Sequence, residues 1–174
     1  MAASGHSLAF EAARGGRLEE LAVLWKGDPA SFLTADACGC LPSWAWWDVS
    51  NPTASGNLIA WFKHHGVWHE SVAFTVEGRR NFLMHGLQKA SKKKAASDGE
   101  VDLLDWQLAR LETELPASMW VSPDASGETL PFWLRAMGRH DMVERYVQPR
   151  KEAFLQASLA HVEATQPAKP RPRF

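Results

Sequence analysis

Two segments, one near each end of the 174-residue chain, carry apolar residues at the spacing of an amphipathic helix. The apolar positions of these two predicted helices are Leu18, Leu21, Val23 and Leu24, and Met142, Val143, Tyr146 and Val147. Before each helix stands a glycine, Gly16 or Gly138, whose backbone can take the left-handed conformation that ends a preceding helix. Ser7 and Thr129 lie where a side chain can cap that preceding helix by accepting a backbone N–H. The pattern predicts an antiparallel helix pair at each end of the chain.

The two segments also share their internal spacing. An opening glycine, Gly5 or Gly127, is followed two residues later by Ser or Thr and eleven residues later by the second glycine. Self-similarity of this kind is typical of helical solenoids, because one helix pair cannot bury its apolar face alone and stacks on its neighbours. The repetition therefore predicts a stack of helix pairs.

On these residues the chain resembles the ankyrin-repeat family, whose unit reads G-x-T-P-L-H-x-A-A-x-x-G-H. The matching positions are Gly5, Ser7, Ala12, Ala13, Gly16 and Leu21 in the first copy, and Gly127, Thr129, Gly138, Val143 and Tyr146 in the last. The Thr-Pro-Leu-His core of the family unit is altered in both copies. The resemblance implies a helical-repeat fold and a role in binding other proteins.

The middle of the chain fits two altered units, opened by Gly39 and Gly78. The helices expected in these two units cover residues 43–47, 55–65, 81–90 and 101–114. Polar inserts at 91–99 and 117–126 lengthen the repeat beyond the roughly 33 residues of a regular ankyrin unit.

The fold predicted from these patterns is all-α, an ankyrin-like helical repeat solenoid of about four irregular helix pairs within residues 1–165. The expected parts are units near 5–36, 39–76, 78–116 and 127–149, followed by a capping helix at 150–164. Its apolar side chains are expected to cover the last unit, since an open solenoid end would expose core; they are Phe154, Leu155, Leu159 and Val162. Residues 166–174, rich in Pro and Arg, are predicted to be a disordered tail.

Charge and composition narrow the classes of partner. The formal net charge is −1, and 45% of the residues are hydrophobic, which is enough for a core. Lys92, Lys93 and Lys94 form the only basic run, inside a polar insert, so nucleic-acid binding is not expected. No apolar stretch approaches the length that spans a bilayer, and no secretory signal is visible at the N-terminus, so a cytoplasmic protein without membrane contact is expected.

Cys38 and Cys40 lie one residue apart, which is too close for an ordinary disulfide and supplies only half of a zinc site. Small residues suit the turn that opens the second unit, so a structural role is favoured over metal binding or redox chemistry. A cytosolic location would keep both thiols reduced.

A second group of metal-ligating residue types is the cluster His64, His65 and His69, with Glu70 adjacent. The cluster raises the alternative of a metal-dependent enzyme, although its spacing differs from the H-E-x-x-H motif of a helix face. Imidazoles at 64 and 65 also suit a helix C-terminus, where they favour the dipole. No nucleophile elbow, P-loop or paired catalytic carboxylate motif is present, so neither catalysis nor a cofactor is expected.

Tryptophan is unusually frequent, with nine residues. Trp46 and Trp47 occupy positions where the ankyrin unit has two alanines, so two indoles must spread the neighbouring helices or enter an altered core. Trp44 is expected in the core or on the surface, whereas Trp133 falls on the inner, concave side in the ankyrin-like register. An exposed Trp there would suit an interface, since Trp is enriched at binding hot spots.

The resemblance implies a partner-binding surface made of loop tips and inner helix faces. The residues that match these positions are His6, Glu11, Arg14, Asp48, Arg79, Met84, Gln88, Glu128, Trp133 and Met137. The leading hypothesis is a non-enzymatic protein–protein interaction module. The short, stand-alone form resembles ankyrin-type proteins that bacteria encode beside secreted toxins, which implies an immunity protein that neutralises a toxin. The alternatives are the metal-dependent enzyme at His64, His65 and His69, or a structural protein that oligomerises through the aromatic-rich second unit.

Overall fold

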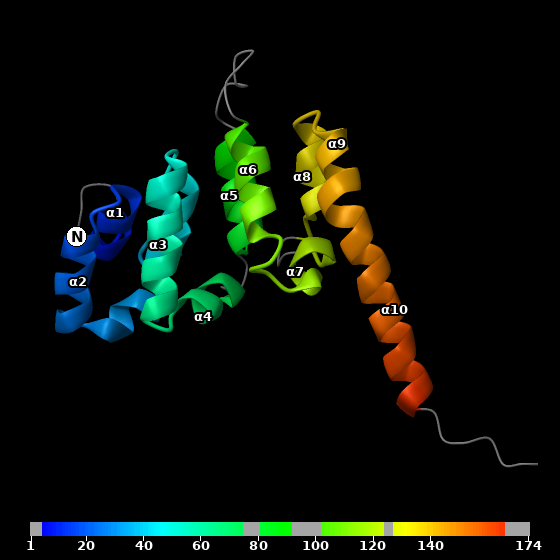
Figure 1. The fold of residues 1–174 in the computed structure, drawn as a ribbon, viewed down its shortest axis with the longest axis horizontal. Helices are drawn as coiled ribbons and strands as arrows, with labels where there is room; N and C mark the ends of the chain where they lie inside the picture. Colours follow the sequence, from blue (N-terminus) through cyan, green and yellow to red (C-terminus); the bar gives the residue numbers. More distant parts are fainter. Residues whose placement is uncertain (1–4, 75–80, 92–101, 124–126, 166–174) are drawn as a thin grey trace, which may run out of the picture.

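A computed structural model of the chain describes residues 5–74, 81–91, 102–123 and 127–165, and every regular element within these ranges is helical. The all-α prediction is therefore confirmed. The α-helices are α1 (Leu8–Arg14), α2 (Leu18–Gly27), α3 (Pro52–His64), α4 (Trp68–Ala73), α5 (Phe82–Ser91), α6 (Leu103–Leu111), α7 (Ala117–Val121), α8 (Leu130–Ala136), α9 (His140–Met142) and α10 (Gln148–Thr165). Two 3₁₀ helices, η1 (Pro29–Leu33) and η2 (Pro42–Asp48), and the π-helical segment η3 (Val143–Val147) complete the chain (Figure 1).

The predicted helix starts and stops at the two ends of the chain are confirmed. Ser7 Oγ accepts the backbone N–H of Phe10 at 3.1 Å, and Thr129 caps α8 in the same way. Gly16 and Gly138, which follow α1 and α8, have φ values of +65° and +74°. Only glycine adopts this conformation at little steric cost, so the repeated glycine ends both helices for the same local reason.

The short helices α1, η2, α5 and α8 lie in a row, each packed against the next (Figure 1). Ala12 and Ala13 of α1 are fully buried, and their small side chains allow the close approach of α1 to η2. Helices α2, α3 and α6 lie beside this row (Figure 1). None of the helices in the described ranges combines the length and the apolar character that crossing a bilayer requires.

The second unit departs from the others because its first helix is a 3₁₀ helix filled with tryptophan. Trp44, Trp46 and Trp47 of η2 are all buried, so the two indoles in place of alanines enter the core. The indole N–H of Trp44 donates to the backbone carbonyl of Ser71 in α4 at 2.8 Å. The ring of Trp47 lies against Gly86 of α5. Helix α5 thus makes room for the indole of Trp47 at a residue that has no side chain.

The polar insert expected at 117–126 is wrong in its first half, because residues 117–121 form helix α7. Trp120 of α7 is fully buried, with its ring 6.1 Å from that of Tyr146. The guanidinium of Arg150 also lies over this indole, 4.4 Å from its centroid. The buried Trp120 packs α7 against η3 and α10. The polar composition of residues 117–126 does not predict this contact.

The expectation that α10 covers the last unit through its apolar residues is also wrong. Phe154, Leu155 and Leu159 are 39%, 50% and 63% exposed. The helix contacts α7 and η3, but its C-terminal part extends away from the other helices (Figure 1). The side chain of Val162, most of the insert at 91–99, Lys92 to Lys94 and the tail 166–174 lie outside the described residues.

Candidate functional site

We call the row formed by α1, η2, α5 and α8 the inner row. It carries a chain of charged side chains that runs from α1 to α5 and that we call the charged row: Glu11, Arg14, Asp48 and Lys89. Arg14 Nη1 lies 3.6 Å from Glu11 Oε2, and Arg14 Nε lies 3.9 Å from Asp48 Oδ2. Lys89 forms an ion pair with the same Asp48 oxygen, and its ammonium lies 5.3 Å from the ring centroid of Phe10. The charged row therefore links three successive helices of the row.

The charged row remains accessible to solvent. The side chain of Arg14 is 54% exposed and that of Lys89 is 27% exposed. Three of its four residues were predicted from the resemblance, and the structure brings Glu11, Arg14 and Asp48 together as expected. Sequence reasoning missed Lys89, whose neighbour Gln88 it chose instead.

The third unit shows why Lys89 was missed. Met84 was assigned to the inner face together with Gln88, but Met84 is fully buried, so that assignment is wrong. The inner positions of α5 are instead His85 and Lys89, again four residues apart. The predicted inner positions, Met84 and Gln88, were each displaced by one residue, although their separation of four residues was right. Much of the surface of α5 is buried, so its apolar pattern alone does not identify the inner positions; the buried residues are Phe82, Leu83, Met84, Gly86 and Leu87.

His85 is an almost buried imidazole next to the charged row. Burial, with Lys89 as the next cause, lowers the pKa of His85 to about 4. Its Nδ1 lies 3.8 Å from the thiol of Cys40, and its Nε2 is buried without a hydrogen-bond partner among the described residues. His85 is therefore neutral at physiological pH.

The last unit contributes an aromatic end to the inner row. The indole N–H of Trp133 donates to Glu128 Oε2 at 2.9 Å, and the ring of Phe132, 56% exposed, lies 6.0 Å from that of Trp133. Trp133 and Met137 are partly buried and pack against the core. The hydrogen bond holds Trp133 in place at the surface of α8.

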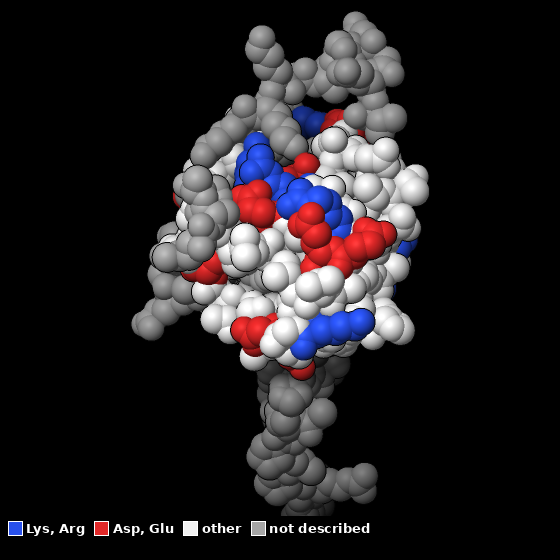
Figure 2. Space-filling model, turned by 90° about the vertical axis from the view of Figure 1, so that its left-hand side faces the viewer, with Lys and Arg blue, Asp and Glu red and all other residues white. Residues whose placement is uncertain are grey.

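The outer end of the molecule, at α1 and α2, is a mixed surface. A groove of about 390 Å³ there is lined by apolar and charged side chains: Leu8, Glu11, Arg17, Glu19, Glu20, Val23 and Leu24. Figure 2, which views this end, shows acidic and basic side chains interspersed with uncharged surface. No single sign of charge dominates the end.

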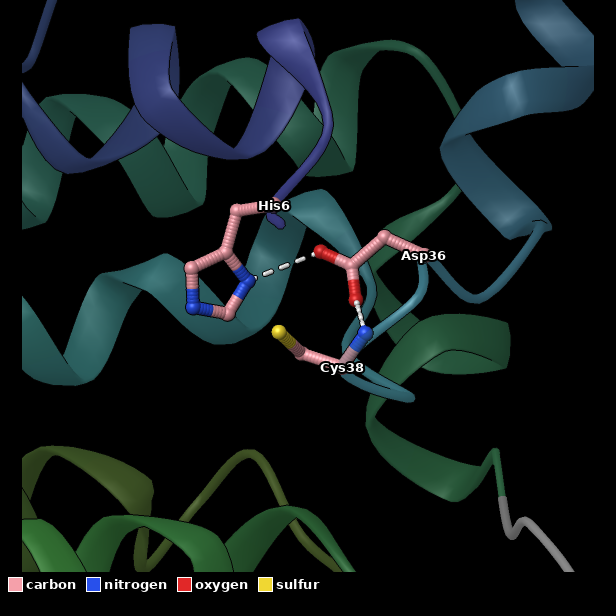
Figure 3. A group of neighbouring side chains, drawn as sticks. All are labelled: His6, Asp36 and Cys38. Atoms are coloured by element: carbon pink, nitrogen blue, oxygen red, sulfur yellow. Dashed lines mark hydrogen bonds and ion pairs between the residues drawn. The ribbon is translucent and has the colours of Figure 1, made fainter. Parts of the chain in front are cut away.

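His6, expected at a loop tip, belongs to a compact group with Asp36 and Cys38 (Figure 3). His6 Nδ1 lies 2.9 Å from Asp36 Oδ2, and the carboxylate also accepts the backbone N–H groups of Cys38 (2.9 Å), Cys40 (3.0 Å) and Ser7 (3.3 Å). Burial by itself would raise the pKa of Asp36, but the hydrogen bonds from Cys40, His6 and Ser7 outweigh it and lower that pKa below its ordinary value. Asp36 is thus an ionised, nearly buried acceptor.

Within the described residues, the group of three His, Cys, Asp or Glu donors close enough to hold one metal ion is His6, Asp36 and Cys38. The cluster His64, His65 and His69 does not converge in this way. His65 instead donates from Nδ1 to the backbone carbonyl of Trp61 at 2.8 Å. Its ring stacks on the Trp61 indole with centroids 3.9 Å apart. The imidazole thus closes the C-terminus of α3, as the alternative interpretation expected.

Arg79 lies outside the described residues, so its place relative to the charged row is not described. No protein-family model, curated protein sequence or solved structure matches the chain. The geometry of the inner row and of the His6 group is therefore the basis for assigning a function.

Proposed function

We propose that the chain is a non-enzymatic protein-binding scaffold of the ankyrin type, whose inner helix faces hold a partner protein. The observation that carries the proposal is the charged row, which spans three packed helices with side chains that still reach solvent. The repeated cap and glycine at α1 and α8 support the ankyrin-type unit. A scaffold of this kind presents its residues in a fixed order along the row.

The charged row suits a partner because its ion pairs are partly exposed. Such pairs contribute only about 0–1 kcal/mol to stability, so exchanging one of them for a pair with the partner costs little. Charges of both signs favour an oriented encounter and disfavour wrong partners. The charged row would thus determine which partner binds and in which orientation.

Trp133 provides the anchor in this proposal. It lies at the other end of the inner row, held by Glu128 and flanked by Met137 and the exposed Phe132. Aromatic residues and Met are enriched in interface cores, whereas charged residues form the rim. The partner would therefore place an apolar side chain against α8 and charged side chains against α1, η2 and α5.

The partner class in the proposal is a toxin, which the chain would neutralise by covering its active site. This part rests on the resemblance to small ankyrin-type proteins encoded beside secreted toxins, which is an analogy at the level of the fold. A rigid inner face that buries a partner surface without chemistry of its own fits such an inhibitor.

The test begins with the tagged chain as bait in a lysate of the native cells, followed by identification of the protein it retains. Calorimetry with the purified partner then compares wild type with Arg14→Glu, Lys89→Glu and Trp133→Ala. Each substitution is expected to weaken binding at least about tenfold, since charge reversal places like charges together and Trp is a frequent hot spot. Expression of the partner in sensitive cells, with and without the chain, tests the immunity role.

Arg110→Glu is the matched control, because Arg110 is an exposed arginine on α6, which is not one of the four helices of the inner row. It should leave affinity unchanged. Wild-type affinity in all three inner-row variants would reject the inner row as the binding surface, and a partner without toxicity would reject the immunity role alone.

A further inference from the structure

The His6 group joins the start of the first unit to the turn that opens the second. Residues 6 and 36 are 30 positions apart in sequence, yet their side chains are hydrogen-bonded. The turn is tight, because Gly39 donates its N–H to the carbonyl of Asp36 at 2.8 Å and has a φ of +74°. This backbone carries Cys38 back toward the imidazole, with its sulfur directed into the space between His6 and Asp36 (Figure 3).

The three donors are held before any ligand binds. The His6 ring stacks on Phe10 with centroids 4.0 Å apart and an interplanar angle of 10°. The Asp36 side chain is only 3% exposed. Its carboxylate accepts backbone N–H groups from two segments, Ser7 before α1 and Cys38 and Cys40 in the turn. Cys38 is an exposed residue, so a metal ion can reach the group from solvent.

The donor atoms of His6, Asp36 and Cys38 all lie within 4.8 Å of one another. We propose that these three residues form a binding site for a divalent transition-metal ion of the zinc class. Nitrogen, sulfur and carboxylate oxygen are the ligands that Zn²⁺ takes in proteins, whereas Ca²⁺ and Mg²⁺ prefer sites made of oxygen alone. Three protein ligands leave a further coordination position, which the exposure of Cys38 leaves accessible to water.

Binding requires a small change of protonation. The Cys38 thiol releases its proton to solvent, and the thiolate becomes the sulfur ligand. His6 can use Nε2 and keep its hydrogen bond to Asp36, as metal-bound imidazoles commonly do with a carboxylate. It can also use Nδ1, in which case the imidazole carries its single proton on Nε2 and gives up the hydrogen bond to Asp36.

A Cys–His–Asp group could instead activate a nucleophilic thiol, and the arrangement argues against that use. In a catalytic triad the acid and the nucleophile contact opposite nitrogens of the imidazole, so the ring separates them. Here Asp36 accepts the backbone N–H of Cys38 itself, and its carboxylate lies within 4.8 Å of the thiol. Carboxylate, imidazole and thiol therefore converge on one point.

Cys40 is outside the group although it is only two residues from Cys38. Its side chain is buried, and its sulfur lies near His85 Nδ1 on the other side of the turn. Cys40 therefore offers a matched control for Cys38. The exposed His64 offers the corresponding control for His6.

The experiment is a titration of the reduced, full-length, metal-free chain with Co²⁺ and then with Zn²⁺. We expect saturable binding of one Co²⁺, a near-ultraviolet absorption band from thiolate-to-cobalt charge transfer, and loss of that band when Zn²⁺ displaces the cobalt. Cys38→Ser should abolish the band, and His6→Gln should weaken binding by at least about tenfold, as loss of metal-site residues commonly does. Cys40→Ser and His64→Gln should bind as wild type does.

Cys38 is exposed, so Cys38→Ser should fold normally, and circular dichroism checks this for each variant. The site assignment is overturned if Co²⁺ does not bind saturably, if the band survives Cys38→Ser, or if Cys40→Ser abolishes it while Cys38→Ser does not. Fast alkylation of Cys38 by iodoacetamide that depends on His6, without metal uptake, would also overturn it and identify a nucleophilic thiol. None of these outcomes depends on whether the inner row binds a protein.

Discussion

Gly86 of α5 lies directly against the indole of Trp47, so that a Cβ at position 86 would come within 2.1 Å of two ring carbons. This contact explains how the large ring of Trp47 fits between η2 and α5. The space for the large side chain comes from a missing side chain on the next helix. Two residues 39 positions apart therefore compensate each other.

Gly86→Ala should destabilise the fold by about 1–3 kcal/mol, because the added methyl group overpacks the core against Trp47. The higher helix propensity of alanine offsets about 1 kcal/mol at most. Gly56 of α3 is the matched control, since nothing lies within 4 Å of a Cβ there. Urea unfolding should show Gly56→Ala as neutral or stabilising. Equal midpoints for the two variants would contradict the contact.

Gly16→Ala should cost roughly 1–2 kcal/mol, because φ at this position is +65° and a side chain is strained in the left-handed region. Space is not the reason, since the nearest atom to a Cβ is 3.9 Å away, on Ala54. Gly27→Ala, at the end of α2 with an ordinary φ and open space, is the comparison. If thermal unfolding ranks Gly27→Ala as the more damaging change, the assignment of Gly16 as a helix terminator is wrong.

Stability should fall as the pH is lowered from about 6.5 to about 4, because the pKa of His85 is about 4 in the folded chain and 6.5 is its ordinary value. In this window the unfolded chain binds a proton that the folded chain excludes, and the effect reaches about 3 kcal/mol. Asp36 adds to the loss only below its ordinary value of 3.8, because its pKa is lowered in the folded chain.

Denaturant midpoints of wild type and His85→Gln, measured from pH 7 to pH 4, separate the histidine from the other groups. His85→Gln should be less stable at pH 7. Its stability should not show the additional decrease between about pH 6.5 and 4 that His85 causes in wild type. The same slope in the variant would show that another group titrates in this window.

Trp120→Ala should destabilise by about 3–5 kcal/mol, because it leaves a cavity under α7 and removes the contacts with Tyr146 and Arg150. Leu159→Gln should change stability by less than about 0.5 kcal/mol, because Leu159 is exposed on the projecting part of α10. Calorimetric unfolding of both variants tests whether α7, rather than the distal part of α10, covers the last unit. A large effect of Leu159→Gln would mean that α10 packs on the protein after all.

The first and last units were predictable because their signals are local. Ser7, Gly16, Thr129 and Gly138 act on backbone groups within a few residues, so their spacing is sufficient to place the helix ends. The middle was less predictable. The apolar pattern of α5 indicated a helix, but placing His85 rather than Met84 on its inner face required knowing which neighbours cover that helix.

Parts of the candidate sites were predictable from the resemblance and parts were not. Glu11 and Arg14 lie three residues apart on α1, and Asp48 lies on η2, which packs against α1, so helix spacing and the resemblance together placed them on one surface. Asp36 had no such signal, because its partners His6 and Cys38 are assembled by the packing of the first unit against the following turn. Contacts between distant segments have no fixed spacing for a sequence pattern to reveal.

The sequence by itself determined that this chain is helical and where the helices of its first and last units begin and end, since caps, glycine turns and apolar spacing act over one or two turns. Only the tertiary structure decided which apolar residues are covered, as Trp120 and Leu159 show, and which polar groups meet. The physical reason is that burial and the convergence of donors such as His6, Asp36 and Cys38 depend on segments far apart in the chain. Helix propensity and capping act within each segment, so they do not determine contacts between distant segments.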